Sequence, residues 1–227
     1  MEKIKDLYLG RKAVILCNGP SLNKVNFPEL KKSGVFVFGL NKINLLFETT
    51  SFRPDAVVSV NPLVLEQNAE FFNGTSIPLF LSSDGLKRGV KSRPNITYLH
   101  STNMRGTFAT DCSWSIFQGH TVTYVALQLA YHMGFDSVAL AGCDHYFSRS
   151  GPANKTVDAE QADPDHFDSR YFSGNMKWQL PDLMESEASY LLAKKIFQET
   201  DRSIVNCTDG GALEIFPREA LRDFLDV

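Results

Sequence analysis

The sequence predicts an α/β fold, with a mainly parallel and twisted sheet flanked by helices. Two observations carry this prediction. Short apolar runs rich in Val, Ile and Phe alternate along the chain with segments whose apolar residues recur at helical spacing. Several of these runs stop abruptly at Asn, Gly or Asp, as strands do where they enter turns. Strands that alternate with helices pair in parallel, because the crossover helices return the chain to the same edge and cover the sheet.

Five strands are predicted in the first half of the chain. The first is continuously apolar and enters a turn at Asn18, as expected of a buried strand. The second, Val-Phe-Val-Phe-Gly-Leu, ends at Asn41, and the third, Asp-Ala-Val-Val-Ser-Val, ends at Asn61. The fourth is a short apolar run, and the fifth has the weakest pattern. Their ranges are 13–17, 35–40, 55–60, 78–82 and 97–100.

The second half of the chain continues the alternation. Apolar residues at helical spacing predict a helix that ends at Gly134, a residue suited to a helix C-terminus. A buried strand then ends at Gly142, and a strongly amphipathic helix precedes the last strand. The predicted helices are 121–133, 185–200 and 218–226, and the predicted strands are 137–141 and 204–207.

Residues 148–181 form a polar segment that interrupts this alternation. The segment is rich in Asp, Pro and Gly and has no regular periodicity, which is typical of a functional lid or a disordered loop. Its aromatic side chains argue against plain disorder. We therefore expect a lid-like insertion within one domain that spans residues 1–227. These aromatic residues are Phe167, Tyr171, Phe172 and Trp178.

The composition is that of an ordinary globular protein. The 227 residues are 43% hydrophobic and 22% charged, and the net charge of −3 gives no indication of a nucleic-acid binder. The four cysteines have no metal-binding spacing, and Cys17 and Cys143 are predicted to be small buried apolar residues. No apolar run resembles a signal peptide or a membrane span, so the expected location is a reducing cytoplasm.

The turn after the first strand is a candidate ligand site. The strand enters Asn18-Gly19-Pro20-Ser21, which offers backbone N–H groups, a small glycine and two polar side chains. In α/β proteins, ligands bind at the carboxyl ends of the strands, where this turn lies. The structural alternative is a strand-to-helix turn that needs Gly and Pro for its backbone alone.

Neighbouring strands carry polar residues at the same edge. Asn41 and Asn61 follow the second and third strands, and Asp144 follows the strand at 137–141. Each has a structural alternative, because Asn and Asp suit turns and caps. Their coincidence with Asn18 at one edge favours a site that recognises sugar hydroxyls, a base edge or a phosphate.

Three histidines are candidates for chemistry. His145 stands next to Asp144, and His166 lies in the lid-like segment, where an imidazole suits a general base near neutral pH. His120 precedes the helix at 121–133, whose first N–H groups, with Thr121, suit an anion. An ordinary N-cap role is the alternative for Thr121. The remaining two, His100 and His132, are predicted to be structural.

Several catalytic signatures are missing from the sequence. No GxxxxGK[ST] loop, GxGxxG turn or GxSxG elbow is present, which disfavours P-loop kinases, dinucleotide dehydrogenases and α/β hydrolases. No Asp-x-Asp pair stands at a strand end, which weakens the case for a metal-dependent sugar-nucleotide transferase.

Four segments resemble a known family. The sequence is similar to the small bacterial sialyltransferases of lipooligosaccharide synthesis, and to the broader MptE-like group of Rossmann-like proteins. That group includes sialyltransferase-like domains of motility accessory (flagellin glycosylation) proteins and a pterin diphosphokinase. The resemblance covers residues 11–146 well and residues 160–218 by scattered similarities. The segments that carry it are 14–22, 37–41, 60–63 and 138–146.

The resemblance implies a function and a site. It implies a Rossmann-like glycosyltransferase that takes a CMP-activated acidic sugar, such as a sialic-acid-like nonulosonic acid or Kdo, into surface polysaccharide or lipopolysaccharide, with no cofactor and no metal. Tyr146 is then expected to stabilise the leaving phosphate. The residues implied to bind the nucleotide-sugar are Asn18, Gly19, Pro20, Ser21, Asn41, Asn61, Thr121, Gly142 and Asp144.

The catalytic base departs from the family pattern. The sialyltransferases carry their catalytic His in the lid after a Tyr and a Gly, where this chain has Asn175 after Gly174. The nearest substitutes are His166 and His145, so these two residues are the expected candidates for the base.

Two alternative functions stay open. A diphosphokinase of the pterin type would transfer diphosphate from ATP and would need Mg²⁺ held by acids. A non-catalytic nucleotide-sugar-binding protein would need no base at all. The acids available to the first alternative are Asp144, Asp163, Asp165 and Asp168.

The expected partners are a nucleotide-sugar donor and a glycan acceptor. No nucleic acid and no integral membrane segment is expected, and a homo-oligomer is compatible with the sequence. The expected cytoplasmic location includes peripheral attachment at the inner membrane, although no basic amphipathic helix marks a membrane surface.

Overall fold

The structure is a computed structural model that describes residues 1–102 and 104–226. Its centre is a seven-stranded sheet in which every neighbouring pair of strands is parallel. The predicted α/β Rossmann-like fold with a mainly parallel sheet is therefore confirmed. In spatial order the strands are β11 (Ser203–Asn206), β8 (Ser137–Ala141), β1 (Lys12–Leu16), β2 (Phe36–Leu40), β3 (Ala56–Ser59), β4 (Leu79–Ser82) and β5 (Ile96–Leu99).

The strand order reverses direction at β1. From β1 the chain adds β2 to β5 on one side, and it then returns to add β8 and β11 on the other. The helices that follow β1 and β8 lie on opposite faces of the sheet, and α/β proteins bind ligands in the crevice at the carboxyl ends of the strands at such a reversal. The register pairs Leu16 with Ala141, so both strands end at the same level and deliver Asn18 and Asp144 to this crevice.

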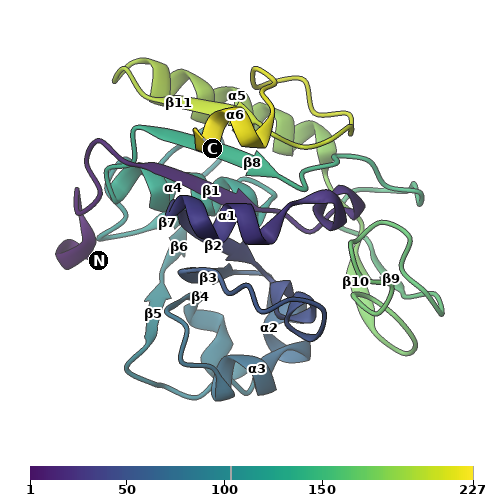
Figure 1. The fold of residues 1–227 in the computed structure, drawn as a ribbon. Coiled ribbons are helices and arrows are strands. Elements are labelled where there is room, and N and C mark those ends of the chain that lie inside the picture. Colours follow the sequence, from purple (N-terminus) through teal and green to yellow (C-terminus); the bar gives the residue numbers. More distant parts are fainter. Residues whose placement is uncertain (103, 227) are drawn as a thin grey trace.

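Helices cover both faces of the sheet. The helices between β1 and β5 lie on one face with the C-terminal helix, and the helices that lead into β8 and β11 lie on the other. Figure 1 shows α1 and α6 in front of the sheet and α4 behind it. The α-helices are α1 (Phe27–Ser33), α2 (Pro62–Gln67), α3 (Ala69–Gly74), α4 (Val122–His132), α5 (Leu183–Gln198) and α6 (Leu221–Leu225).

Side chains of alternate residues build two apolar cores. In β1, Ile15 packs toward α4 and α5, and Val14 packs toward the face of α1 and α2. Both are fully buried, which explains why the strands are continuously apolar. All four cysteines are buried and free, which confirms that Cys17 and Cys143 are small buried residues. His132, also buried, accepts a hydrogen bond from the backbone N–H of Cys112 and is structural, as predicted.

The predicted strands agree with the structure to within a residue or two, and the terminal helix is the main correction. The helix predicted over 218–226 is only α6 (Leu221–Leu225). Arg218 lies outside it, because its guanidinium donates to the carbonyl oxygens of Gly210, at 2.7 Å, and Gly211, at 3.0 Å, and holds the preceding loop. Helix α5 begins two residues earlier than predicted, since the Asp182 side chain caps it.

Short elements complete the structure. Four 3₁₀ turns connect larger elements, and the short strands form two separate pairs, one parallel and one antiparallel. The turns are η1 (Glu2–Ile4), η2 (Pro20–Lys24), η3 (Ile43–Glu48) and η4 (Ser83–Lys87). The strands are β6 (Ser101–Thr102) with β7 (Ile116–Phe117), and β9 (Thr156–Asp158) with β10 (Lys177–Gln179).

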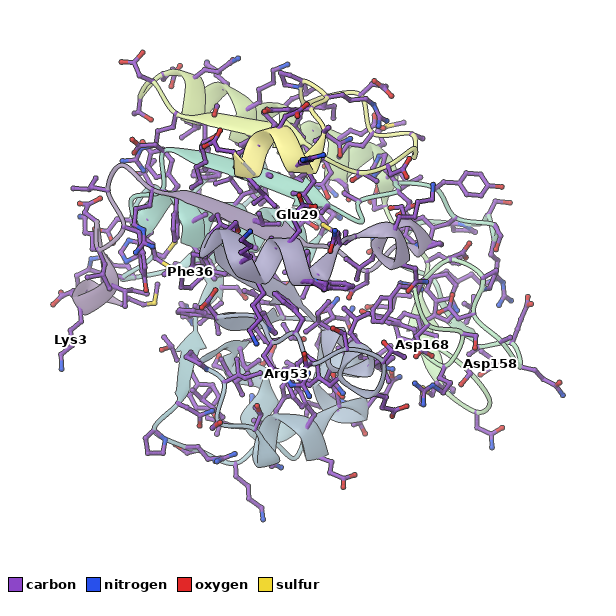
Figure 2. All side chains as sticks on the ribbon, in the orientation of Figure 1. Lys3, Glu29, Phe36, Arg53, Asp158 and Asp168 are labelled. Carbon is purple, nitrogen blue, oxygen red and sulfur yellow. The ribbon has the colours of Figure 1, made fainter. Side chains whose placement is uncertain are left out.

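Residues 148–181, hereafter the lid, contain the antiparallel pair β9–β10. The sequence of the lid has no regular periodicity, because each of these strands is only three residues long. The lid lies beyond the end of the sheet toward which β8 runs (Figure 1). Figure 2 places Asp158 and Asp168 of the lid on the opposite side of the molecule from Phe36, at the start of β2.

The lid is joined to the body by backbone and side-chain hydrogen bonds. The Phe167 N–H donates to the carbonyl oxygen of Asn18 at 2.9 Å, and the Asn23 amide donates to the Phe167 carbonyl at 2.7 Å. These bonds hold the lid against the turn after β1. Separately, no helix among the described residues is long and apolar enough to cross a membrane.

Candidate functional site

Two adjoining cavities lie between the carboxyl ends of the strands and the lid. The switch-point cavity, of about 170 Å³, lies between the turns after β1 and β8. The outer cavity, of about 280 Å³, extends from the end of β3 beneath the lid. Both are lined by Asn41, His120, Thr121, Val122, Phe147, His166, Tyr171 and Pro181, so they form one continuous site.

The turn after β1 is locked in place by Asp144. Its carboxylate accepts hydrogen bonds from the Ser21 hydroxyl at 2.6 Å and from the Ser21 backbone N–H at 3.2 Å. The Gly19 N–H donates to the carbonyl oxygen of Gly142 at 2.8 Å, which ties the two turns together. Ser21 therefore supports the site without lining either cavity, and Pro20 faces a neighbouring cavity.

Gly19 is required by close packing. A Cβ at this position would overlap the Asp144 carboxylate and lie 2.8 Å from the Gly142 carbonyl oxygen. Gly19, Gly142 and Asp144 all line the switch-point cavity, so the two turns present backbone to any ligand there.

Asn18 carries an unsatisfied hydrogen-bonding group into the site. Only 9% of the residue is exposed, and it lines the switch-point cavity. Its Oδ1 is buried and has no hydrogen-bond partner among the described residues. A buried amide oxygen without a donor costs about 1–3 kcal/mol, which a hydroxyl or amino group of a ligand would recover.

The other two predicted asparagines occupy different environments. Asn41 lines both cavities in a left-handed backbone conformation, and its Oδ1 accepts from the Ser59 hydroxyl at 3.0 Å. Asn61 lines the outer cavity only. Its Oδ1 caps α2 by accepting from the Leu63 N–H at 2.9 Å, and its Nδ2 donates to Gln179 of the lid at 3.1 Å.

Helix α4 begins at the boundary between the cavities. Thr121 is its N-cap, with Oγ1 accepting from the Thr123 N–H at 3.3 Å. The predicted capping and cavity-lining roles of Thr121 therefore coexist. His120 lies beside it with Nδ1 3.4 Å from the Asp182 carboxylate. The positive end of the α4 dipole lies at this boundary.

His166 reaches from the lid into both cavities. Its Nδ1 lies 2.8 Å from Oδ2 of Asp163, and its ring stacks on Tyr171 with centroids 4.0 Å apart and planes at 4°. The His166 side chain is 12% exposed. A carboxylate is only an acceptor, so the bond to Asp163 requires a proton on Nδ1; in the neutral imidazole the lone pair is then on Nε2.

His145 and Tyr146 line the switch-point cavity from the turn after β8. The His145 Nε2 lies 3.0 Å from the Glu187 carboxylate, so this nitrogen is already paired. Tyr146 is 66% exposed and projects from the rim. The structure thus brings His166, His145 and Tyr146 to one cavity, and His166 alone of the three also lines the outer cavity.

Lys42 lines neither cavity but supports the lid beside them, a role that the sequence did not predict. It is 4% exposed, and its Nζ donates to the carbonyl oxygen of Tyr171 at 2.6 Å and to Gln67 at 2.8 Å. The ammonium also lies 4.6 Å from the centre of the Phe172 ring. Its position directly after Asn41 at a strand end was the available signal. Lys42 thereby fixes the lid segment that carries His166.

The stability contribution of Lys42 is expected to depend on pH. Burial lowers the pKa of Lys42 to about 8, with partial compensation by Asp163, whereas an unfolded lysine titrates near about 10.4. Between pH of about 8 and about 10.4, Lys42 is protonated in the unfolded chain and increasingly deprotonated in the folded one. The free energy of unfolding of the natural protein should therefore rise, relative to Lys42→Met, as pH increases from about 8 to about 10. Urea unfolding of both proteins at pH 7 and pH 10 measures this; an unchanged difference would contradict it.

The four acids considered for a magnesium site do not converge. Asp144 binds Ser21, and Asp163 binds His166. Asp165 accepts from Ser148 at 2.7 Å, and Asp168 binds the Arg170 guanidinium at 2.7 Å. Within residues 1–102 and 104–226, no three His, Cys, Asp or Glu side chains gather as a metal site.

The strand order of the parallel sheet reverses at β1, and a cavity lies at the carboxyl ends of the strands there. These two features define an α/β Rossmann-like protein with its candidate site at the topological switch point. Residues 1–150 match the family described as MptE-like, 6-hydroxymethylpterin diphosphokinase MptE-like, and the chain belongs to this family. This confirms the resemblance inferred from the motifs.

One solved structure is similar over nearly the whole chain. It is the MAf glycosyltransferase from Magnetospirillum magneticum AMB-1, with a TM-score of 0.59 and 16% sequence identity over 93% of this chain. The likeness at this identity is one of fold. The present chain spans 34% of the length of that protein. No curated protein matches the sequence.

Proposed function

We propose that this protein is a metal-independent glycosyltransferase that uses a CMP-activated acidic sugar, a sialic-acid-like nonulosonic acid or Kdo, in surface polysaccharide or lipopolysaccharide synthesis. The observation that carries the proposal is the switch-point cavity, which is lined both by Asn18, whose amide oxygen has no partner among the described residues, and by the carboxylate-bound His166 of the lid. The similar fold of a protein named as a glycosyltransferase supports it.

The nucleotide occupies the switch-point cavity in this proposal. At Gly19 and Gly142 no side chain separates the nucleotide from the backbone of the turns. Asn18 supplies an acceptor for a ribose hydroxyl or a base amino group. The transferred sugar then extends into the outer cavity, where Asn41 and the start of α4 provide polar contacts. The aromatic wall of Phe172 and Trp178 closes the other side, with ring centroids 5.5 Å apart.

The reaction moves one proton and one glycosyl group. The acceptor hydroxyl gives its proton to Nε2 of His166, and its oxygen attacks the anomeric carbon. The bond between that carbon and the phosphate oxygen breaks, its electron pair stays on the phosphate, and CMP leaves. The Tyr146 hydroxyl and the first N–H groups of α4 offset the charge on the phosphate.

Charge compensation in the site comes from neutral donors and histidines. The described residues that line the two cavities include no Lys or Arg. An anionic donor is therefore held by backbone N–H groups, amides and the imidazole of His120. Such contacts position an anion through directed hydrogen bonds more than through a strong positive field.

Nucleotide preference tests the proposal. Calorimetric titration with CMP, UDP, GDP and ATP should show CMP binding at least tenfold more tightly than the other three, a difference of about 1.4 kcal/mol. The resemblance of segments 14–22, 37–41, 60–63 and 138–146 to CMP-dependent sialyltransferases motivates this expectation. Equal binding of the four nucleotides, or preference for ATP, would overturn the CMP-sugar assignment.

The diphosphokinase is the second candidate, because it gives the matched family its description. It requires Mg²⁺, ATP and a hydroxymethylpterin, and it releases AMP. Incubation of the protein with these three should give no AMP, since Asp144, Asp163 and Asp165 each bind a separate protein partner. Metal-dependent AMP release would establish the diphosphokinase instead.

A further inference from the structure

The carboxylate of Asp163 is held rigidly inside the lid. Its Oδ2 accepts hydrogen bonds from His166 Nδ1 at 2.8 Å and from the Phe172 N–H at 3.0 Å. Its Oδ1 accepts from the Asp165 N–H at 2.9 Å, and the side chain is only 6% exposed. Both oxygens are thus fixed by backbone donors, which leaves the carboxylate one orientation.

The imidazole that faces it is equally constrained. The ring of His166 lies flat on Tyr171, and the Phe172 ring meets it edge-on, with centroids 5.3 Å apart and planes at 89°. Tyr171 is itself fully buried, and Lys42 holds its carbonyl oxygen. A rotation of the His166 ring would break the stack and the bond to Asp163 together.

We infer that Asp163 is the positioning residue of the proposed transfer: it fixes His166 in the Nδ1–H tautomer and keeps Nε2 directed at the acceptor hydroxyl. This inference rests on the proposed function for its catalytic meaning. The acceptor proton goes to Nε2, and the charged imidazolium is then stabilised by the Asp163 carboxylate, which stays ionised. A His with a fixed tautomer and orientation is the arrangement that makes an imidazole an effective base.

The Asp163–His166 pair also accounts for a lid that resembles the family pattern but carries its proposed base at a different position. The family pattern would place its base near Asn175, whereas this chain builds the pair within residues 163–166 of the same lid. The spacing of three residues lets a turn close the pair locally. Backbone donors from Asp165 and Phe172 then complete the shell around the carboxylate.

The test combines ¹⁵N NMR of the histidine side chains with two substitutions. In the ligand-free natural protein, at a pH where His166 is neutral, its signals should show the Nδ1–H tautomer. Asp163→Ala removes the acceptor and should shift His166 toward the Nε2–H tautomer. Asp163→Asn keeps one acceptor oxygen, which serves His166 and Phe172, while its NH₂ replaces the oxygen that accepts from the Asp165 N–H; it should preserve the Nδ1–H tautomer without the charge.

The rate of glycosyl transfer should fall most in the variant that loses the Nδ1–H tautomer of His166. Release of CMP from a CMP-activated nonulosonic acid or Kdo should fall by about 10²–10⁴-fold in kcat for Asp163→Ala, with a smaller loss for Asp163→Asn and little change in donor KM. Asp168→Ala is the matched control, because Asp168 is a lid carboxylate bound to Arg170 and lines neither cavity. It should leave both readouts unchanged.

The two readouts separate failure of this inference from failure of the proposed function. An Nε2–H tautomer in the natural protein, or an unchanged tautomer in Asp163→Ala, would overturn the role of Asp163. The expected tautomers with no turnover of any CMP-activated sugar by the natural protein would overturn the glycosyltransferase instead. Preserved activity in Asp163→Ala would also overturn the positioning role.

Discussion

Replacing His166 with alanine should reduce glycosyl transfer by about 10²–10⁴-fold in kcat, the usual contribution of a general base. His166 is the one lid imidazole that lines both cavities of the described structure, and its Nδ1 is paired with Asp163 so that Nε2 is left to accept a proton. Binding of CMP should persist, because the turns at Asn18–Gly19 and Gly142–Asp144 remain. CMP release during transfer and calorimetry with CMP measure the two effects separately.

Two further histidines make this experiment decisive. His100→Ala is the control, because His100 is exposed and lines neither cavity. It should transfer at the natural rate. His145→Ala tests the other candidate base, whose Nε2 is paired with Glu187. Loss of transfer in His145→Ala with full activity in His166→Ala would reverse the assignment of the base.

Replacing Gly19 with alanine should destabilise the protein and abolish nucleotide binding. The added methyl group would overlap the Asp144 carboxylate and crowd the Gly142 carbonyl oxygen. Either Asp144 leaves Ser21 or the turns separate, and both changes distort the wall of the switch-point cavity. Overpacking of this kind costs about 1–3 kcal/mol, and each kcal/mol lowers the Tm of a chain this long by about 2–4 °C.

Gly74→Ala is the matched control for this substitution. Gly74 ends α3, and a Cβ there would meet no atom within 4 Å. Its alanine variant should keep the natural Tm and the natural affinity for CMP. Thermal unfolding and calorimetry on both variants give the comparison, and equal behaviour of the two would refute the steric role of Gly19.

The sheet and its carboxyl edge were predictable because they depend on local patterns. Apolar runs that end at Asn18, Asn41 and Asn61 indicate both a strand and the position of its end, and parallel pairing places those ends together. The lid was recognised from composition, since 148–181 combines polar residues with aromatic ones. Helix α4 and the cap at Thr121 followed from periodicity and capping chemistry.

The roles of individual side chains depended on tertiary contacts that a sequence does not specify. Asp144 lines the switch-point cavity and its ligand contact stays a prediction, but the bonds of its carboxylate to Ser21, 123 residues away in the chain, were not predictable from the sequence. Asn61 was expected to bind the nucleotide-sugar, and the structure uses its Oδ1 to cap α2. Lys42 escaped notice because a lysine is normally exposed, and only the lid that folds over it makes it buried.

A crystal structure of the protein with bound CMP tests the central claim most directly. The account predicts the phosphate at the start of α4 beside Tyr146, a hydrogen-bond donor of CMP on Asn18 Oδ1, and His166 Nε2 facing the outer cavity. The nucleotide bound elsewhere on the sheet, or an Asn18 Oδ1 still without a partner in the complex, would contradict it.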